Sequence, residues 1–296
     1  GVLIKSKLPL GGFSLSRYTF DQALFEKAKL NGVVCLTDTV SAISFENDQF
    51  SVQTKNNRTL HAKFVIGAFG KRSLLDQKLS RDFINKKAPF LAVKAHYQGT
   101  YPQNLVGLHN FNGGYCGVSN IENNALNLCY IAEYKEFKKY KNIDEFQEKV
   151  VFKNELLKEI FNKSKMIFDK PLTISQISFE SKPVVEDHVL MCGDSAGMIH
   201  PLCGNGMGMA IRGAKILSES LLDFFNGSLG SRKELEDLYR KNWKHAFQTR
   251  LIAGRLLTRL FRKEHLATWS IKVLRGFPGL VPKVIKLTHG KIMNGI

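Results

Sequence analysis

The feature that most limits how this chain can fold is the stretch "HVLMCGDSAGMIHPLCGNGMGMAIRGA", residues 188–214. An apolar run ends at Cys192-Gly193, a turn with proline and glycine follows, and a helical pattern begins near Gly206. In open α/β sheets ligands bind at the carboxyl ends of strands, and the free N–H groups of a following helix attract negative charge. The stretch therefore predicts a strand, a ligand-binding turn and a helix.

The residue types in this turn suit a ligand with hydroxyl groups and a polar ring or phosphate. A carboxylate at Asp194 accepts hydrogen bonds from sugar-like hydroxyls. Pro201 turns the chain, and Gly204-Asn205-Gly206 let the backbone approach a ligand closely. For a glycine-rich loop taken alone, ordinary turn chemistry is the alternative interpretation.

The first quarter of the chain reads as a helix followed by short strands. Residues 15–30 carry apolar positions at helical spacing, and Asn31-Gly32 provides a helix end. We then expect a small antiparallel meander that returns to a buried strand, Phe64 to Gly67, from the segments "VVCL", "SAISFEN", "FSVQTK" and "TLHAKFVIGAFG".

From about Asp76 the pattern changes to long alternating strands, which predict one antiparallel sheet with a solvated or ligand-facing side. A helical stretch over 143–161 interrupts it. Long helices are expected over 207–226 and 232–262, and then short helices broken by Pro278 and Pro282.

Charge and cysteine usage restrict the class of protein. The formal net charge is +17, with the basic excess concentrated toward the C-terminus, which suits nucleic acid, anionic lipid or a phosphorylated ligand. The five cysteines are scattered without zinc spacing, so we expect reduced thiols, most of them in the core, in a cytoplasmic protein without a metal site. No apolar stretch has the roughly 18 residues of a membrane span.

The glycine-rich stretch resembles the second flavin motif of the flavoproteins that share the p-hydroxybenzoate hydroxylase fold, a Gly-Asp, Pro, Gly-x-Gly series. The resemblance implies FAD as cofactor, with Asp194 at the ribityl chain and the following helix directed at the flavin ring. It assigns cofactor contacts in this stretch to Gly193, Asp194, Pro201, Gly204, Asn205, Gly206 and Met207.

Two upstream segments extend the resemblance. "FVIGAFGKRSLLD" is similar to the family's strand, Gly-Ala-Asp-Gly, basic, Ser motif, and assigns cofactor contacts to Gly67, Gly70 and Ser73; Phe69 stands where the family has the Asp that helps position a nicotinamide donor. "SRYTFDQALFEKAKLNG" resembles the family's Arg helix, which places Arg17 close to the cofactor. A surface ion pair is the alternative role of Arg17.

The resemblance implies an α/β fold, α+β overall: a partial Rossmann-like FAD-binding domain, an inserted antiparallel-sheet substrate domain and a helical C-terminus. The GxGxxG segment with which family members begin is absent, so we expect about a hundred further residues upstream. The chain as given is expected to hold FAD weakly or not at all, and to be inactive alone. The predicted parts are an incomplete FAD-binding domain, a substrate domain, a returning FAD-binding segment and a helical region, over 1–75, 76–182, 183–227 and 228–296.

Within the family, Gly197 and the series Ala210 to Gly213 resemble the geranylgeranyl reductase branch. Flavin halogenases are disfavoured, because their Trp-x-Trp-x-Ile-Pro segment has no counterpart. Tyr115 matches the start of the reductases' Tyr-x-Trp-x-Phe-Pro strand and is the substrate candidate, but Gly117 and Ser119 depart from that strand. A smaller and more polar pocket, or a different lipid, is therefore equally compatible.

The resemblance predicts an FAD-dependent oxidoreductase that acts on a lipid, isoprenoid or polyketide-like substrate, with NAD(P)H or another electron donor. A monooxygenase is the alternative, and a non-catalytic basic membrane-surface or binding module is the second. The flavin carries the chemistry, so no acid or base is obligatory; His200 and Cys203 are weak catalytic candidates, each with a structural role as the alternative.

The basic C-terminal region allows peripheral contact with the inner membrane surface, and a helix with a solvated charged face is the plainer interpretation. Nucleic acid is not expected, because no recognised module is present. The basic residues on which the membrane interpretation rests are Arg250, Arg255, Arg259, Arg262 and Lys263.

Overall fold

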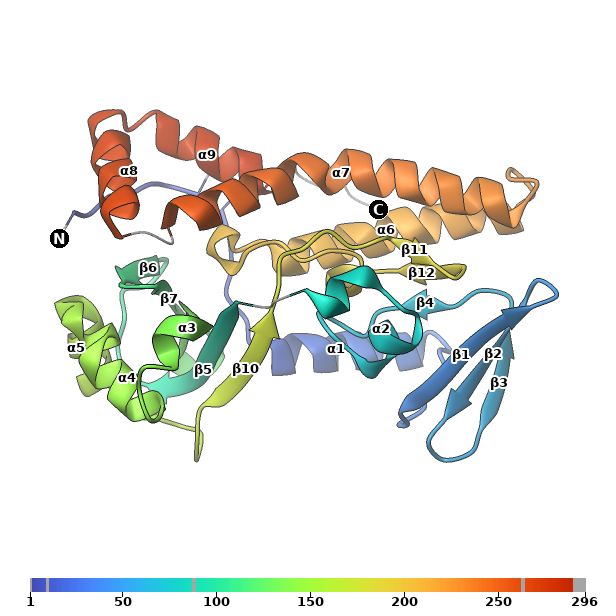
Figure 1. Ribbon diagram of the computed structural model, residues 1–296, viewed down its shortest axis with the longest axis horizontal. Helices are drawn as coiled ribbons and strands as arrows, with labels where there is room; N and C mark the ends of the chain where they lie inside the picture. Colours follow the sequence, from blue (N-terminus) through green and yellow to red (C-terminus); the bar gives the residue numbers. More distant parts are fainter. Residues whose placement is uncertain (1, 9–10, 87–88, 262–263, 290–296) are drawn as a thin grey trace. The chain divides into compact units, whose positions relative to one another are not determined.

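A computed structural model describes residues 2–8, 11–86, 89–261 and 264–289 of the chain. It divides into two compact units, each assembled from segments far apart in the sequence, and Figure 1 shows their elements. The first unit contains residues 1–35, 87–177 and 257–284, and the second contains residues 36–86, 178–256 and 285–296.

The first unit is built on an antiparallel sheet with the strand order β10-β5-β8-β7-β6, in which β9 also pairs with β5. Alternation of large apolar and polar residues along β5 and β8 places one side of the sheet in a core. The strands are β5 (Phe90–Gln98), β6 (Val106–Phe111), β7 (Gly114–Asn120), β8 (Ala125–Glu133), β9 (Lys165–Met166) and β10 (Leu172–Ile177).

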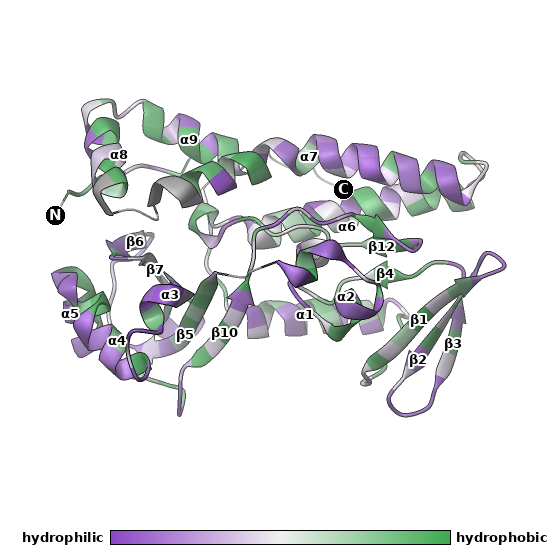
Figure 2. Ribbon diagram, in the orientation of Figure 1, coloured by the Kyte–Doolittle hydropathy of each residue, from purple (hydrophilic) through white to green (hydrophobic). Residues whose placement is uncertain are grey.

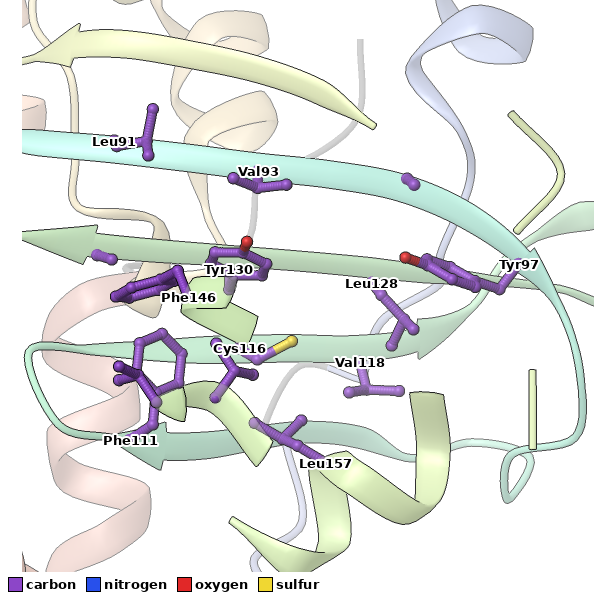
Figure 3. Close-up of a cluster of buried hydrophobic side chains, with 14 of the residues drawn as sticks. Leu91, Val93, Tyr97, Phe111, Cys116, Val118, Leu128, Tyr130, Phe146 and Leu157 are labelled. Atoms are coloured by element: carbon purple, nitrogen blue, oxygen red, sulfur yellow. The ribbon is translucent and has the colours of Figure 1, made fainter. Parts of the chain in front are cut away.

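One face of this sheet carries the hydrophobic core of the unit (Figure 3). Val93 and Tyr130 are direct cross-strand partners, and the Tyr130 ring stacks on Phe146 with the ring centroids 6.2 Å apart. Phe146 is fully buried, and burying a side chain of that size stabilises the fold by about 1.5–3 kcal/mol. The covering helices are α3 (Tyr134–Phe137), α4 (Ile143–Lys149) and α5 (Glu155–Asn162).

Helix α1 (Arg17–Leu30) confirms the expected helix and its end. The Ser16 side chain accepts a hydrogen bond from the Thr19 N–H at the start of the helix, and Gly32 follows its end with φ +81°. No residue of α1 is buried, so helix packing does not hold it in place.

The second unit contains the meander β1 (Val40–Glu46), β2 (Gln49–Thr54) and β3 (Thr59–Ala62), and a separate small sheet with the order β11-β12-β4. In the small sheet, β4 (Ile66–Gly67) pairs in parallel with β12 (Val189–Met191), and β11 (Val185–Glu186) pairs antiparallel with β12. Its helices are α2 (Leu74–Lys78), α6 (Gly206–Phe225) and the greater part of α7 (Arg232–Phe261).

Helix α7 is fixed to the small sheet by a buried hydrogen bond. Tyr239 is fully buried, and its hydroxyl donates to the Met191 carbonyl over 2.5 Å. Figure 2 shows hydrophilic residues dominating the part of α7 nearer its N-terminus. The last helices are α8 (Glu264–Gly276) and α9 (Leu280–His289), and no helix of the described chain is long and apolar enough to cross a membrane.

Several sequence expectations differ from the structure. "VVCL" is not a strand: Val33 and Val34 are exposed, and this segment has no ladder partner in the described part of the chain. The buried strand expected from Phe64 shrinks to Ile66–Gly67. The prediction that Pro282 breaks a helix is wrong, because Pro282 lies in the first turn of α9, where a missing N–H costs little.

The helical stretch over 143–161 divides into α4 and α5 around a 3-10 turn at Val151–Lys153. Asn154 ends that turn and caps α5, because its side-chain oxygen accepts from the N–H groups of Leu156 and Leu157. The antiparallel sheet, the long helices α6 and α7, and the break at Pro278 agree with expectation.

Candidate functional site

The parallel pairing of β4 with β12 brings the two glycine motifs to one edge of the small sheet. Gly67 ends β4 and pairs with Met191, and the Cys192 N–H donates to the Gly67 carbonyl over 3.0 Å. Because the two strands are parallel, the backbone leaves the sheet at this edge after both β4 and β12. The carboxyl ends of neighbouring parallel strands are where α/β proteins bind ligands.

Glycine is required at particular points of this edge. A Cβ on Gly67 would lie 2.6 Å from the Met191 sulfur and 2.9 Å from the Phe69 ring. Three further motif glycines adopt positive φ, a conformation that side-chain-bearing residues rarely take: Gly70 at +83°, Gly193 at +62° and Gly204 at +61°. Packing therefore requires glycine at Gly67, and backbone conformation favours it at Gly70, Gly193 and Gly204.

The start of α6 leaves its backbone N–H groups available. The N-cap residue Asn205 makes no side-chain cap, because its amide nitrogen donates instead to the carbonyls of Thr288 and His289, each over 3.1 Å. Gly206 has open space where a Cβ would stand. An uncapped helix start with a bare glycine suits an anionic or carbonyl-bearing ligand.

A shallow hollow with no appreciable enclosed volume lies at this point, lined by Gly193, Asp194, Gly197, Ile199, Gly206, Met209, Ala210 and Trp243. Trp243 comes from α7 and closes one side, and a Cβ on Gly197 would approach its ring to 2.9 Å.

Buried charges underlie the same edge. Arg81 is almost fully buried and pairs with the buried Asp76 over 2.7 Å. It also donates to the Ser195 carbonyl over 3.0 Å. Breaking a buried pair of this kind costs about 3–5 kcal/mol, because the remaining charge loses its partner.

Lys71 follows the glycine turn, and its buried Nζ has no hydrogen-bond partner among the described residues. Burial lowers the pKa of this ammonium, and the nearby Asp194 carboxylate partly opposes that change. Burying an ammonium that makes no hydrogen bond costs free energy. The position suits an anionic group of a ligand.

The two catalytic candidates are both buried and neutral. Burial lowers the pKa of His200 to about 4, and its Nδ1 accepts from the Leu202 N–H. The ring also contacts Phe179, with the ring centroids 4.5 Å apart. Burial raises the pKa of the Cys203 thiol to about 11. Structural roles are visible for both residues, and their catalytic roles stay predictions.

Three further predicted site residues have visible structural roles. Ser73 caps α2 in a reciprocal capping box with Asp76. Arg17 is exposed on α1 and pairs with Asp21 over 2.9 Å, which agrees with its alternative role as a surface ion pair. Pro201 begins a 3-10 turn, and Met207 is partly exposed in the first turn of α6.

Tyr115 lies in the first unit on β7, opposite Ile131 and Asn110, and is buried. Its neighbour Cys116 faces the core cluster, so Tyr115 faces the other side of the sheet. Edge strands β6 and β10 add exposed apolar side chains to that side: Val106, Leu108, Leu172 and Ile174. This side of the sheet also has a polar part, because the cross-strand partners His96 and Asn127 each bury a side-chain atom that has no hydrogen-bond partner in the described chain.

The basic C-terminal candidates do not form one free face. Arg250 is buried over the Phe247 ring, 5.5 Å from its centroid. Arg255 is half-buried, Arg259 is placed only by its backbone in α7, and Arg262 and Lys263 lie outside the described residues.

Sequence reasoning missed Trp243, which lines the hollow, and Arg81 and Lys182, which donate to backbone carbonyls of the glycine motifs: Arg81 to Ser195, and Lys182 to Lys71 and Asp194. No local pattern marks them. Ala210 and Gly197 were recognised as branch markers but not as lining residues. Among the described residues, no group of three or more His, Cys, Asp or Glu side chains is placed to hold a metal ion.

The residues present fit a flavin nucleotide. Ring carbonyls and phosphates require hydrogen-bond donors, which the glycine backbone, the uncapped start of α6 and the Lys71 ammonium supply. Hydroxyl groups require an acceptor, which the Asp194 carboxylate supplies.

Comparison with known proteins agrees with this fit. The sequence model of the family described as "FAD binding domain" matches residues 16–250. An uncharacterized protein of Methanocaldococcus jannaschii, MJ1520, is 31% identical over 116 residues, which cover 37% of this chain and 27% of that protein.

Solved structures share the fold. The flavin-dependent halogenase CmlS superposes with a TM-score of 0.70 at 17% identity, covering 81% of this chain and 45% of the halogenase. A flavoprotein/dehydrogenase from Cytophaga hutchinsonii gives 0.69 at 17% identity, covering 94% and 76%. The chain thus spans less than half the length of the halogenase and about a quarter of the archaeal relative. The expected α/β class, with a Rossmann-like FAD domain and a helical C-terminus, is confirmed.

Proposed function

The chain belongs to the FAD binding domain family, and on that premise we propose that its glycine-rich edge forms the ribityl and flavin-ring side of an FAD site. The hollow at the start of α6 carries this proposal, because it joins bare glycine backbone, uncapped N–H groups and the Asp194 carboxylate in one place. Asp194 would accept from ribityl hydroxyls, and the first N–H groups of α6 would donate to a ring carbonyl.

We propose that the protein is an FAD-dependent oxidoreductase acting on an apolar substrate, of the geranylgeranyl reductase-like type. Bound flavin supplies the redox chemistry, and the chain orients it and excludes water through Trp243, Ile199 and Met209. The exposed apolar side chains on the Tyr115 side of the sheet support a hydrophobic substrate. The polar pair His96 and Asn127 there supports a substrate that also carries a polar group.

A matched pair of glycine substitutions tests the cofactor site. Gly206→Ala places a methyl group in the open space at the start of α6, where the flavin would lie, without a clash in the protein. Gly276→Ala makes the same change at the end of α8, also into open space. We expect Gly206→Ala to weaken FAD binding at least tenfold, and Gly276→Ala to leave it unchanged, by titration of flavin fluorescence.

The unfolding free energy of both variants should not fall, because alanine is favoured over glycine in helices. A full-length protein that purifies colourless and takes up no flavin would contradict the proposed function and favour the non-catalytic binding module.

The monooxygenase alternative differs from the reductase in its use of oxygen. Reduced nicotinamide is the donor we propose, although Phe69 packs beside Gly67 where the family has a carboxylate. Substrate-dependent oxygen uptake with one oxygen atom incorporated into product would establish the hydroxylase. Anaerobic turnover with substrate reduction would establish the reductase.

We also propose peripheral contact with an anionic membrane surface through α8 and the start of α9. Trp269 and Phe277 are 62% and 64% exposed, and Lys272 and Arg275 on α8 and Lys283 on α9 are exposed as well. No Asp or Glu occurs from Leu266 to the end of the sequence. Exposed aromatic residues with a purely basic surround are typical of helices that lie in the lipid interface.

Tryptophan fluorescence measures this contact directly, because Trp243 is largely buried whereas Trp269 is exposed. Vesicles containing phosphatidylserine should shift the emission to the blue at low salt, and about 0.5 M salt should reverse the shift. Neutral phosphatidylcholine vesicles are the control. Absence of a shift, or an equal shift in a Trp269→Phe variant, would remove the proposal.

A further inference from the structure

Lys182 joins the two glycine motifs through their backbone. Its side chain is buried, and Nζ donates to the Lys71 carbonyl over 2.6 Å and to the Asp194 carbonyl over 2.8 Å. The same ammonium lies over the Phe83 ring, 4.3 Å from its centroid. One side chain thus fixes the turn after β4 and the turn after β12 at once.

A second link runs parallel to the first. The fully buried Ser195 hydroxyl donates to the Gly70 carbonyl over 3.0 Å, and Arg81 donates to the Ser195 carbonyl. These contacts join the two turns next to the residues proposed to hold the flavin. All of them are made within the second unit.

Lys182 carries most of its charge at neutral pH. Burial lowers its pKa to about 8, with Arg81 and Arg72 acting in the same direction and Asp76 and Asp194 opposing them. A charged donor makes stronger hydrogen bonds to carbonyls than a neutral one. The hydrogen bonds that this ammonium makes to the two turns offset the free-energy cost of burying it.

We infer that Lys182 is a positioning residue that holds the Gly70–Ser73 turn and the Gly193–Ala196 turn in the geometry that binds FAD. This rests on the proposed function, since the turns are proposed to be the cofactor contacts. Ser195 supports the same arrangement.

Lys182→Met tests the inference, with Lys86→Met as the matched control. Both remove one positive charge, but Lys86 is exposed and pairs only with the surface residue Glu180 among the described residues. Without FAD, deuterium exchange at the Ser73, Ala196 and Gly197 amides, each hydrogen-bonded within its turn, should be at least tenfold faster in Lys182→Met and unchanged in Lys86→Met. Unchanged exchange in folded Lys182→Met would overturn the inference.

The second measurement is FAD affinity of the full-length protein. Losing two charge-assisted hydrogen bonds should weaken it about tenfold or more in Lys182→Met, and not in Lys86→Met. Wild-type protein that binds no flavin would contradict the proposed function, whereas wild type and Lys182→Met that bind FAD equally would contradict the positioning role alone. If Lys182→Met does not fold, Ser195→Ala removes only the hydrogen bond from the Ser195 hydroxyl to the Gly70 carbonyl. Faster exchange at Ser73 in this variant supports the inference, and unchanged exchange overturns it.

Discussion

Gly67 shows how one residue can limit the packing of the edge that we propose binds the cofactor. Its missing Cβ makes room for the Met191 sulfur, the Phe69 ring and Val189, all of which a methyl group would meet within 3.2 Å. Two of these neighbours belong to the adjacent strand β12 and are buried, so relief of the clash would force their side chains to repack. The position requires glycine for packing, with no contribution from a positive φ.

We predict that Gly67→Ala lowers the free energy of unfolding by about 1–3 kcal/mol, the usual cost of overpacking a closed core. Chemical denaturation followed by circular dichroism measures this. Gly117→Ala on β7 is the control, because its Cβ would meet only ordinary contacts at 3.7 Å and beyond. Equal stability of the two variants would show that the strand edge adapts.

At the scale of elements, α1 is notable because it buries no residue. Its first turn is held through Glu122, which accepts from the Ser16 N–H and the Thr19 hydroxyl, each over 2.8 Å. Hydrogen bonds from the Ser16 side chain, its N–H and Thr19 lower the pKa of Glu122 to about 2. Because the pKa of Glu122 is lowered in the folded protein, the stability that its carboxylate contributes is present above about pH 4.5 and is lost as the pH falls toward 2.

We predict that Glu122→Gln accelerates amide exchange throughout α1 while the sheet strands keep their protection. In the wild type, acidification from pH 4.5 to 2 should produce the same loosening, monitored by NMR at the Thr19 and Phe20 amides. Glu159→Gln on α5, which removes an exposed pair with Lys163, should leave α1 unaffected. An α1 that is equally protected in Glu122→Gln would show that other contacts anchor it.

The elements that sequence reasoning predicted correctly are those with a strong local pattern. The apolar spacing of α6 and α7, the alternation of β5 and β8, and the Asn31-Gly32 helix end are all encoded within a few residues. "VVCL" is equally apolar, but a strand also needs a partner strand, and the local sequence does not show whether one exists. The cofactor assignments, the catalytic candidates and the domain boundaries stay predictions.

The lining of the site was predictable in part, for the same reason. Gly193, Asp194 and Gly206 lie within one motif, so their proximity follows from the chain itself. Trp243 reaches the hollow from α7, and Lys182 reaches the two turns from a coil before β11. Only the tertiary packing places such residues, and no spacing rule covers them.

At the scale of the whole molecule, the two units differ in how continuous their cores are. The described core cluster of the first unit lies entirely between Leu91 and Leu157, and its sheet lies between Phe90 and Ile177. The small sheet of the second unit pairs Gly67 with Met191, on either side of that whole segment. A contiguous fragment therefore contains one core but not the other.

We predict that residues 89–177 fold alone. The isolated fragment should show β-rich circular dichroism and a cooperative denaturation, since sheet and covering helices are all present. Residues 178–256, which contain α6 and most of α7 but lack β4, should show helix without cooperative unfolding. A fragment 89–177 without a cooperative transition would mean that the sheet depends on segments outside it.

The parallel pairing of β4 with β12 also sets the order of events during synthesis. Gly67 leaves the ribosome long before Met191, and the ends of so long a loop meet at an entropic cost that grows with its length. Prior folding of the sheet between them shortens the effective loop, because domains generally fold as units while the chain is made. The nascent chain can therefore complete the edge proposed to bind flavin only after β12 and α6 have emerged, so cofactor capture follows the folding of the sheet that lies between the two strands in the sequence.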